Sequence, residues 1–144
     1  MVRFISPEDT LELRSKMLRN NLPKDACIFP SDRVKDAFHL GCFVEEQLVS
    51  IASFHPMKYK TQTTPGYQLR GMATGSAHTG KGYGAELIDF AIEQLNATNA
   101  THLWCNARTS AVGFYLKKGF EVVSAEFEVP EVGPHYEMII NLKI

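Results

Sequence analysis

The sequence predicts an α/β protein of the α+β kind, in which helices pack against a mixed β-sheet. Strand-like segments come before, between and after the helix-like segments, which argues against an all-α or all-β chain. One helix-like segment has a regular apolar face, because Ile88, Ala91, Ile92 and Leu95 are spaced i, i+3, i+4 and i+7. With 144 residues, 44% of them hydrophobic, we expect a single domain, residues 1–144, with a packed core.

The first half of the chain is predicted to form one helix, four strands and two long loops. Ser6 is a suitable N-cap, Pro7 follows at the first helical position, and we expect the helix to end near Arg19. Prolines and short polar side chains predict loops over residues 20–35 and 56–66. The connection at residues 45–47 reads as a tight hairpin turn. The predicted strands are residues 2–5, 38–44, 48–54 and 67–74.

The second half is predicted to alternate helix and strand. The helix with the apolar face ends at residues 96–99, and a short buried strand follows over residues 102–106. Thr109 is expected to cap a helix over residues 110–118, and Gly119 to end it at the C′ position. A strand is expected over residues 120–123. The last strand shows alternating apolar side chains, namely Tyr136, Met138, Ile140 and Leu142.

Charge and hydropathy exclude several classes of protein. There are 15 basic and 16 acidic side chains, a net charge of −1, so no broad nucleic-acid surface is predicted. Arg14, Lys16 and Arg19 gather on one predicted helix, and we interpret them as a solvated face. The N-terminus lacks the apolar core of a signal peptide, and no apolar run approaches the roughly 20 residues that span a bilayer. We therefore expect a cytoplasmic protein with neither a nucleic acid nor a membrane as partner.

The three cysteines, Cys27, Cys42 and Cys105, are odd in number and widely spaced. This pattern favours reduced, mostly buried thiols over a disulfide framework. Neither C-x-x-C nor H-E-x-x-H occurs, so no metal site is predicted.

The most informative stretch is the glycine-rich segment from His78 to Ala85. Glycine stands at every second position, at Gly80, Gly82 and Gly84, directly before the helix with the apolar face. Glycine lets the backbone turn tightly and approach a ligand closely, and a helix N-terminus adds unpaired N–H groups and a positive dipole end. Together these features predict a phosphate-binding loop.

Three kinds of phosphate compound compete for this loop. Gly75 and Gly80-Lys81 have the spacing of a P-loop, but Gly82 follows where that motif needs Ser or Thr for Mg²⁺. A dinucleotide fold needs a complete G-x-G-x-x-G and an acidic residue about 20 positions later, and the sequence has neither. Coenzyme A is the third candidate, and it needs several backbone N–H donors for its pyrophosphate and no metal; a P-loop-like nucleotide binder stays open as an alternative.

Two blocks resemble the GNAT superfamily of acyl-CoA-dependent N-acetyltransferases. The segments 69–74 and 79–85 resemble its motif A, in which Arg or Gln is followed by two residues and then by Gly-x-Gly or Gly-x-Ala, and Gly82-Tyr83-Gly84 matches the end of that pattern. Thr79 stands where Arg or Gln is usual, which removes one side-chain contact and predicts a weakened or altered grip on the cofactor. A second block resembles the family's later strand, tyrosine-bearing helix and Gly-Phe restart: Asn106, Ala111, Phe114-Tyr115 and Gly119-Phe120.

The resemblance, which covers residues 38–120, implies a mostly antiparallel central sheet with helices on both faces. It implies an N-acetyltransferase that moves an acetyl group from acetyl-CoA (coenzyme A) to a primary amine of a small molecule or a peptide. A homodimer is a further expectation. The alternative is a non-catalytic acyl-CoA sensor with the same fold.

The resemblance also implies which residues hold the cofactor. A splayed strand would offer the main chain of Met72, Ala73 and Thr74 to the pantetheine arm. Asn106 is expected either to bond that arm or to cap a turn, and Lys81 either to add a charge to the loop or to lie in solvent. The pyrophosphate would be held by the glycine loop, that is by Thr79, Gly80, Lys81, Gly82, Tyr83, Gly84 and Ala85.

For catalysis, the resemblance implies Tyr115 as the general acid, since a phenol is protonated at neutral pH and donates to a developing thiolate. The alternative is an aromatic packed beside Phe114. The usual carboxylate base is missing from the strand before the loop, where Gln68 and Arg70 stand. We place His55 first as the base, because it ends a strand facing the expected cleft, and deprotonation through ordered water is the alternative. The other candidates are His78, His135, Glu128, Glu131 and Glu137.

The acceptor is less clearly predicted. Glu126, Glu128 and Glu131 lie near the last predicted hairpin, and they either attract a cationic amine or are ordinary surface carboxylates.

Overall fold

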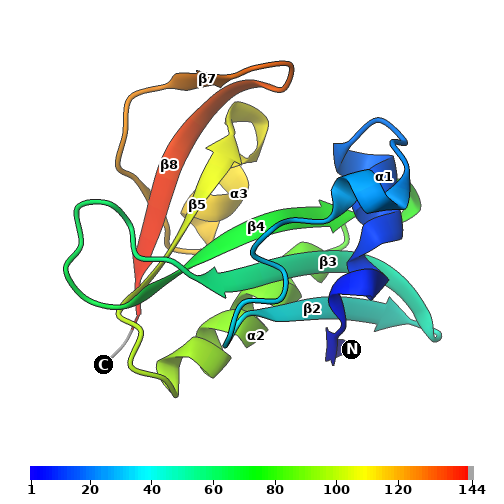
Figure 1. The fold of residues 1–144 in the computed structure, drawn as a ribbon, viewed down its shortest axis with the longest axis horizontal. Helices are drawn as coiled ribbons and strands as arrows, with labels where there is room; N and C mark the ends of the chain where they lie inside the picture. The colour runs from blue at the N-terminus through cyan, green and yellow to red at the C-terminus, as the bar shows by residue number, and fades with distance from the viewer. Residues whose placement is uncertain (143–144) are drawn as a thin grey trace.

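The computed structural model describes residues 1–142 and shows a twisted sheet of eight strands (Figure 1). The order across the sheet is β1-β2-β3-β4-β5-β8-β6, and β7 also pairs with β8. Every neighbouring pair is antiparallel except β4 and β5, so the expected mostly antiparallel sheet is confirmed. The strands are β1 (Val2–Ile5), β2 (Phe38–Val44), β3 (Gln47–Pro56), β4 (Gly66–Thr74), β5 (His102–Arg108), β6 (Glu121–Val122), β7 (Phe127–Val129) and β8 (Gly133–Asn141).

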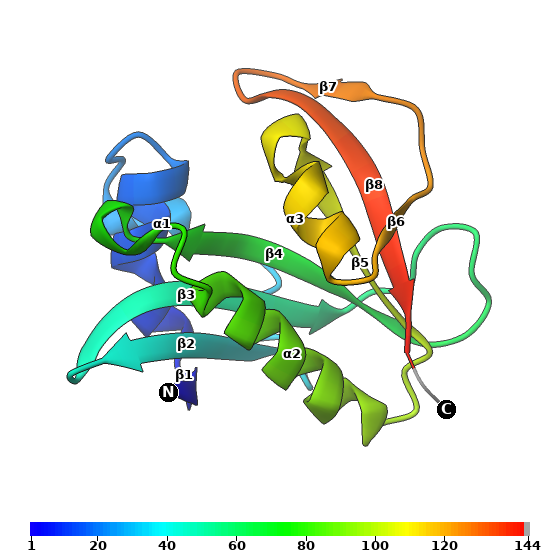
Figure 2. The same cartoon turned by 180° about the vertical axis from the view of Figure 1, so that it is seen from behind.

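Helices cover both faces of the sheet, as expected. The helices α2 (Tyr83–Asn96) and α3 (Val112–Lys117) lie on the face turned to the viewer in Figure 2. The helix α1 (Leu11–Leu18) lies on the other face, which Figure 1 shows. Four short 3₁₀ turns connect these elements: η1 (Pro7–Thr10), η2 (Lys24–Cys27), η3 (Ser76–His78) and η4 (Thr109–Ala111). Within residues 1–142, no helix has the length and apolar character needed to cross a membrane.

Local signals in the sequence account for most of the element ends. The side chain of Ser6 accepts from the Asp9 N–H, and Asp9 accepts from the Ser6 N–H, which completes a capping box at the start of η1. The β2–β3 turn uses Glu45 and Glu46, both with positive φ, as a two-residue hairpin requires. Gly119 has φ +97°, and the Phe120 N–H donates to the Tyr115 carbonyl, so α3 ends as predicted.

The start of the third helix differs from the prediction. Thr109 lies in η4 rather than capping a helix, and its hydroxyl donates to the Pro134 carbonyl at 3.2 Å. The α-helix proper begins three residues later, at Val112. The partner of Thr109 is 25 residues away in the sequence, so no local pattern announces it. The strand predicted over residues 120–123 shortens to β6, and β7 was not predicted.

The core lies between the sheet and α2. Leu87, Ile88, Ala91 and Leu95 of α2 are buried, whereas Ile92 is only partly buried at the edge of the same cluster. They pack against apolar side chains of the central strands, including Leu40, Phe54, Leu103 and Met138. The cysteines are free and buried, as predicted for Cys27, Cys42 and Cys105.

The sheet opens between its two central strands. The parallel pairing of β4 with β5 covers only residues 66–69 and 102–105. Beyond it, β4 pairs only with β3, and β5 pairs only with β8. A register shift between Ile51 and Ser53 lies opposite Gly71, which has φ +62°. The main-chain groups on the inner edges of the two strands are thus left without a strand partner, and this gap positions the functional site.

Candidate active site

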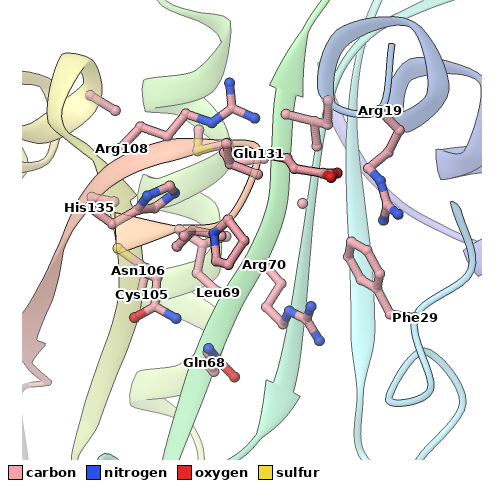
Figure 3. A pocket seen from close by; sticks show the side chains of 18 of the residues that line it. Arg19, Phe29, Gln68, Leu69, Arg70, Cys105, Asn106, Arg108, Glu131 and His135 are labelled. Carbon is pink, nitrogen blue, oxygen red and sulfur yellow. The ribbon is translucent and has the colours of Figure 1, made fainter. Parts of the chain in front are cut away.

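A cavity of about 700 Å³ lies where β4 and β5 separate (Figure 3). Its floor is formed by residues 68–72 of β4 and 105–108 of β5. One wall comes from the end of α1 and the residues after it, together with Phe29, and the other from the β7–β8 turn at residues 129–132. Segments that are far apart in the sequence therefore meet around the gap in the sheet.

The glycine loop runs into the N-terminus of α2, next to this cavity. Gly82 is the N-cap residue and has φ +87°, and no side chain caps the first N–H groups of the helix. A Cβ built on Gly80 or Gly82 would meet no described atom within 4 Å, so these glycines serve the backbone conformation and leave open space above it. The first N–H groups of α2, those of Tyr83, Gly84 and Ala85, have no intrahelical acceptor, so a phosphate that approaches the glycine loop can accept hydrogen bonds from them.

Close packing holds this loop against β4. A Cβ on Gly84 would lie only 2.8 Å from Cε of Met72, so the first turn of α2 sits against the splayed part of the strand. Thr79 is exposed and makes only a long contact of 3.4 Å with the Ser76 carbonyl. Lys81 is exposed and forms no ion pair with residues 1–142.

Tyr115 lies at the floor of the cavity, on α3. Its ring packs edge-on against Phe114 and Phe120, and its hydroxyl lies 3.5 Å from Sδ of Met72. Burial, with the nearby Cys105 thiol, raises the pKa of Tyr115 above its ordinary value, so the phenol keeps its proton. Burial likewise raises the pKa of Cys105 to about 12, so this thiol is neutral. Nothing in the sequence predicted Cys105 at the cavity.

Asn106 stands on β5, one residue beyond the last position paired with β4. Its exposed side chain lines the cavity opposite β4. Thus Tyr115 and Asn106 are brought together with the splayed strand, as the resemblance implied. A catalytic or binding role for either remains a proposal.

His55 does not occupy the position expected of it. It is 6% exposed, its Nδ1 lies 3.3 Å from the Ser31 hydroxyl, and it is not among the residues that line the cavity. Its strand partner Gln68 does line the cavity, so His55 lies one strand away from it, on β3. Burial and the charge of Arg70 lower the pKa of His55.

The structure brings two of the other candidate bases to the cavity. His135 lines it with Nδ1 hydrogen-bonded to the Gly133 carbonyl at 2.9 Å, and Glu131 lines it from the β7–β8 turn. His78 and Glu128 do not line the cavity. Glu137 also lies elsewhere, where it accepts from the Tyr59 hydroxyl at 2.6 Å.

A buried polar network beside the cavity was missed. Arg14 is fully buried and holds Asp32 with two hydrogen bonds of 2.8 and 2.9 Å, so the interpretation of Arg14 as part of a solvated face is wrong. Arg14 also donates to the Ser53 hydroxyl, and its guanidinium lies 3.8 Å from the centre of the Phe29 ring. Its partners lie 18 and 39 residues away in the sequence, and helical spacing alone does not reveal them.

Comparisons with known proteins define the family. Residues 30–142 match the family model described as the acetyltransferase (GNAT) domain. The uncharacterized N-acetyltransferase YitI of Bacillus subtilis (strain 168) is 36% identical over 143 residues, covering 99% of this chain and 96% of that protein. The chain therefore belongs to the GNAT acetyltransferase family. It is an acetyltransferase that uses acetyl-CoA, which excludes the P-loop and dinucleotide alternatives.

Solved structures share the fold at low sequence identity. A GNAT acetyltransferase from Streptococcus pneumoniae superposes with a TM-score of 0.72 at 18% identity, covering 99% of each chain. An aminoglycoside 6'-N-acetyltransferase complexed with coenzyme A gives 0.77 at 11% identity, covering 98% of this chain and 96% of that one. The ribosomal-protein-S18-alanine N-acetyltransferase from Escherichia coli gives 0.76 at 13%, covering 100% and 94%. The names of the last two specify different acceptors, so the fold leaves the acceptor open.

Proposed function

We propose that this protein transfers the acetyl group of acetyl-CoA to a primary amine of a small molecule or a peptide by direct attack, with Tyr115 as the general acid. The observation that carries the proposal is the place of the Tyr115 hydroxyl. It lies beside Met72 at the point where β4 leaves β5, below the start of α2. A proton donor and an unpaired strand edge thus meet at one cavity, and Met72, which lines it, also packs against Gly84 in the first turn of α2.

The residues present fit coenzyme A. The open backbone at Gly80 and Gly82 and the uncapped start of α2 offer N–H donors to a pyrophosphate. The edge of β4 at Met72, Ala73 and Thr74 has no strand partner on the β5 side, so it is free to pair with the pantetheine arm. When bound, acetyl-CoA supplies the thioester whose carbonyl carbon the amine attacks and whose sulfur leaves.

The side chains of this cavity would then manage protons and charge. An N–H of the β4 edge is suited to donate a hydrogen bond to the carbonyl oxygen as negative charge develops on it. One such contact is typically worth a factor of roughly 10²–10³ in kcat. The Tyr115 hydroxyl, which keeps its proton at neutral pH, is suited to protonate the departing sulfur. His135 and Glu131 line the cavity, whereas His55 and Glu137 do not. His135 and Glu131 are therefore our candidates to take the proton released by the amine.

The test compares thiol release from acetyl-CoA, over a panel of primary amines, in the wild type and in Tyr115→Phe. We expect kcat to fall by about 100-fold, the usual range for losing a general acid, while the Kd for coenzyme A stays near the wild-type value. Tyr136→Phe is the matched control, because Tyr136 does not line the cavity and its kcat is expected to be unchanged.

An unchanged kcat in Tyr115→Phe would remove Tyr115 from the mechanism. Binding of coenzyme A without thiol release for any amine would instead support the acyl-CoA sensor.

A further inference from the structure

The charged side chains around the cavity are mainly basic. Three arginines, Arg19, Arg70 and Arg108, line it, and Glu131 is the single carboxylate among the lining residues of the described chain. The protein as a whole has a net charge of −1, so this excess of positive charge is local. The positive electrostatic potential of such a cavity attracts an anionic group and repels a ligand that carries only positive charge.

Arg70 is the arginine closest to the expected chemistry. It belongs to β4, where it directly follows Leu69, the last residue paired with β5, and it lies two residues before Met72. Its side chain is partly buried, yet within residues 1–142 it forms no hydrogen bond and no ion pair. Its one specific contact is a stacking contact, with the guanidinium 4.3 Å from the centre of the Phe29 ring.

The nearest buried carboxylate is not available to Arg70. Asp32 is held by both terminal nitrogens of Arg14, at 2.8 and 2.9 Å, and also accepts the Phe29 N–H at 3.0 Å. Arg14 and Arg70 both lie against the Phe29 ring, at 3.8 and 4.3 Å from its centre. The charge of Arg14 is therefore neutralised by Asp32 inside the protein, whereas Arg70 keeps its charge and its hydrogen-bond donors for a ligand.

The arrangement of charges separates two ends of the cavity. In Figure 3, Arg19, Phe29 and Arg70 lie on the side of α1, whereas Asn106, Arg108 and His135 lie on the side of β5 and β8. Glu131 reaches in from the β7–β8 turn, near the middle of the view. An acceptor that bridges these ends needs an anionic group near Arg70 and an amine near the gap in the sheet.

We propose that the acceptor is a small amine that also carries a carboxylate, as an amino acid does, with the carboxylate bound by Arg70 and Arg19. This inference rests on the proposed function and specifies its acceptor. A planar guanidinium binds a carboxylate through two parallel hydrogen bonds, which positions the neighbouring amine as well as attracting it. Of the three glutamates suggested as attractors of a cationic amine, Glu126, Glu128 and Glu131, only Glu131 lines the cavity.

The test uses sets of three compounds that share the same side chain. Each set consists of an α-amino acid, its α-amide and the amine that lacks the carboxyl group. We expect the wild type to acetylate the amino acid of at least one set with a kcat/KM about 10- to 100-fold above that of the other two, the range of a charged hydrogen bond. In Arg70→Gln this ratio should fall towards one, and Arg70→Lys should keep part of it. The control is Arg33→Gln, which removes an exposed arginine outside the cavity and should keep the ratio.

Binding of the reaction product gives a readout that does not depend on turnover. Calorimetry on the protein saturated with coenzyme A should show binding of the N-acetyl amino acid to the wild type, weaker binding of its amide, and no such difference in Arg70→Gln. Thermal unfolding of both Arg70 variants checks that they are folded.

Three results would overturn the inference. These are a wild type that prefers the amide or the simple amine in every set, an Arg70→Gln variant that keeps the preference, and equal binding of the two N-acetyl compounds. Failure of the proposed function has a different signature, namely no thiol release with any compound of any set. Efficient acetylation of amines without a carboxylate would leave the proposed function standing and remove only this inference.

Discussion

Arg14 and Asp32 tie the segment before β2 to the sheet. Arg14 projects from α1, Asp32 comes from the loop that follows η2, and Ser53, the third partner, lies on β3. Burial alone would raise the pKa of Asp32, but hydrogen bonds from Arg14 and from the Phe29 N–H outweigh it, so the pKa lies below its ordinary value. The pair is therefore charged, and it fixes the Phe29 ring against which Arg70 lies.

Replacing one member of this pair tests its importance. Asp32→Asn leaves the buried Arg14 cation without its counter-charge, so we expect the free energy of unfolding to fall by about 3–5 kcal/mol. Urea denaturation measures this change in the free energy of unfolding. The control is Glu12→Gln, which breaks an exposed pair with Lys16 and should change stability by less than about 1 kcal/mol. Equal effects of the two substitutions would contradict the account.

At the scale of single elements, the start of α2 combines two requirements. The chain adopts a left-handed conformation at Gly82, and the first N–H donors of the helix have no side-chain cap among residues 1–142. A capping Ser or Asp would occupy those donors. Its absence costs the free protein some helix stability, and it leaves these N–H groups available for the phosphate binding that we propose.

The conformation of Gly82 gives a prediction at this scale. In Gly82→Ala the new Cβ has space, but the left-handed conformation costs roughly 1–2 kcal/mol, and each 1.4 kcal/mol is tenfold in affinity. We expect a lower Tm and a Kd for coenzyme A raised up to about 10-fold.

The control for Gly82→Ala is Gly113→Ala. Gly113 lies inside α3, its added Cβ also meets no described atom within 4 Å, and its φ is not positive. Alanine there should raise stability by roughly 0.5–1 kcal/mol. A wild-type Kd in Gly82→Ala would show that the loop conformation does not matter for the donor.

For the whole molecule, buried histidines link stability to pH. Nε2 of His102 accepts the Tyr59 N–H at 3.0 Å, and His39 bridges the Ser53 hydroxyl and the Asp32 carbonyl. Burial lowers the pKa of both histidines, as it does for His55. Below the ordinary pKa of about 6.5, the unfolded chain binds protons that the folded chain does not. Stability is thus fully present above that pH and is lost as the pH falls.

We therefore expect the free energy of urea unfolding to be lower at pH 5.5 than at pH 7.5. His102→Gln should flatten part of this difference, because the amide oxygen of Gln can accept the Tyr59 N–H without titrating. Stability that is constant or increases on acidification would contradict the assignment.

Several features of this molecule followed from the sequence because they depend on neighbours in the chain. Strands β1 and β2 have the predicted bounds, since the cap at Ser6 and the turn at Glu45 and Glu46 mark where they end. The apolar stripe of α2 and the stop at Gly119 are equally local. The short strands β6 and β7 were shortened or missed, because two or three residues carry too little pattern and depend on β8 for their hydrogen bonds.

The sequence by itself determined the family, the sheet with helices on both faces, and the glycine loop that leads into α2, because these depend on local conformation and on short motifs. Tertiary structure alone decided what surrounds the acceptor. It buried Arg14 against Asp32, placed His55 outside the cavity beside Gln68, and left Arg70 in the cavity without a hydrogen bond or ion pair to residues 1–142. The physical reason is that burial and pairing of a charge depend on residues brought close by folding, and nothing in the spacing along the chain encodes that distance.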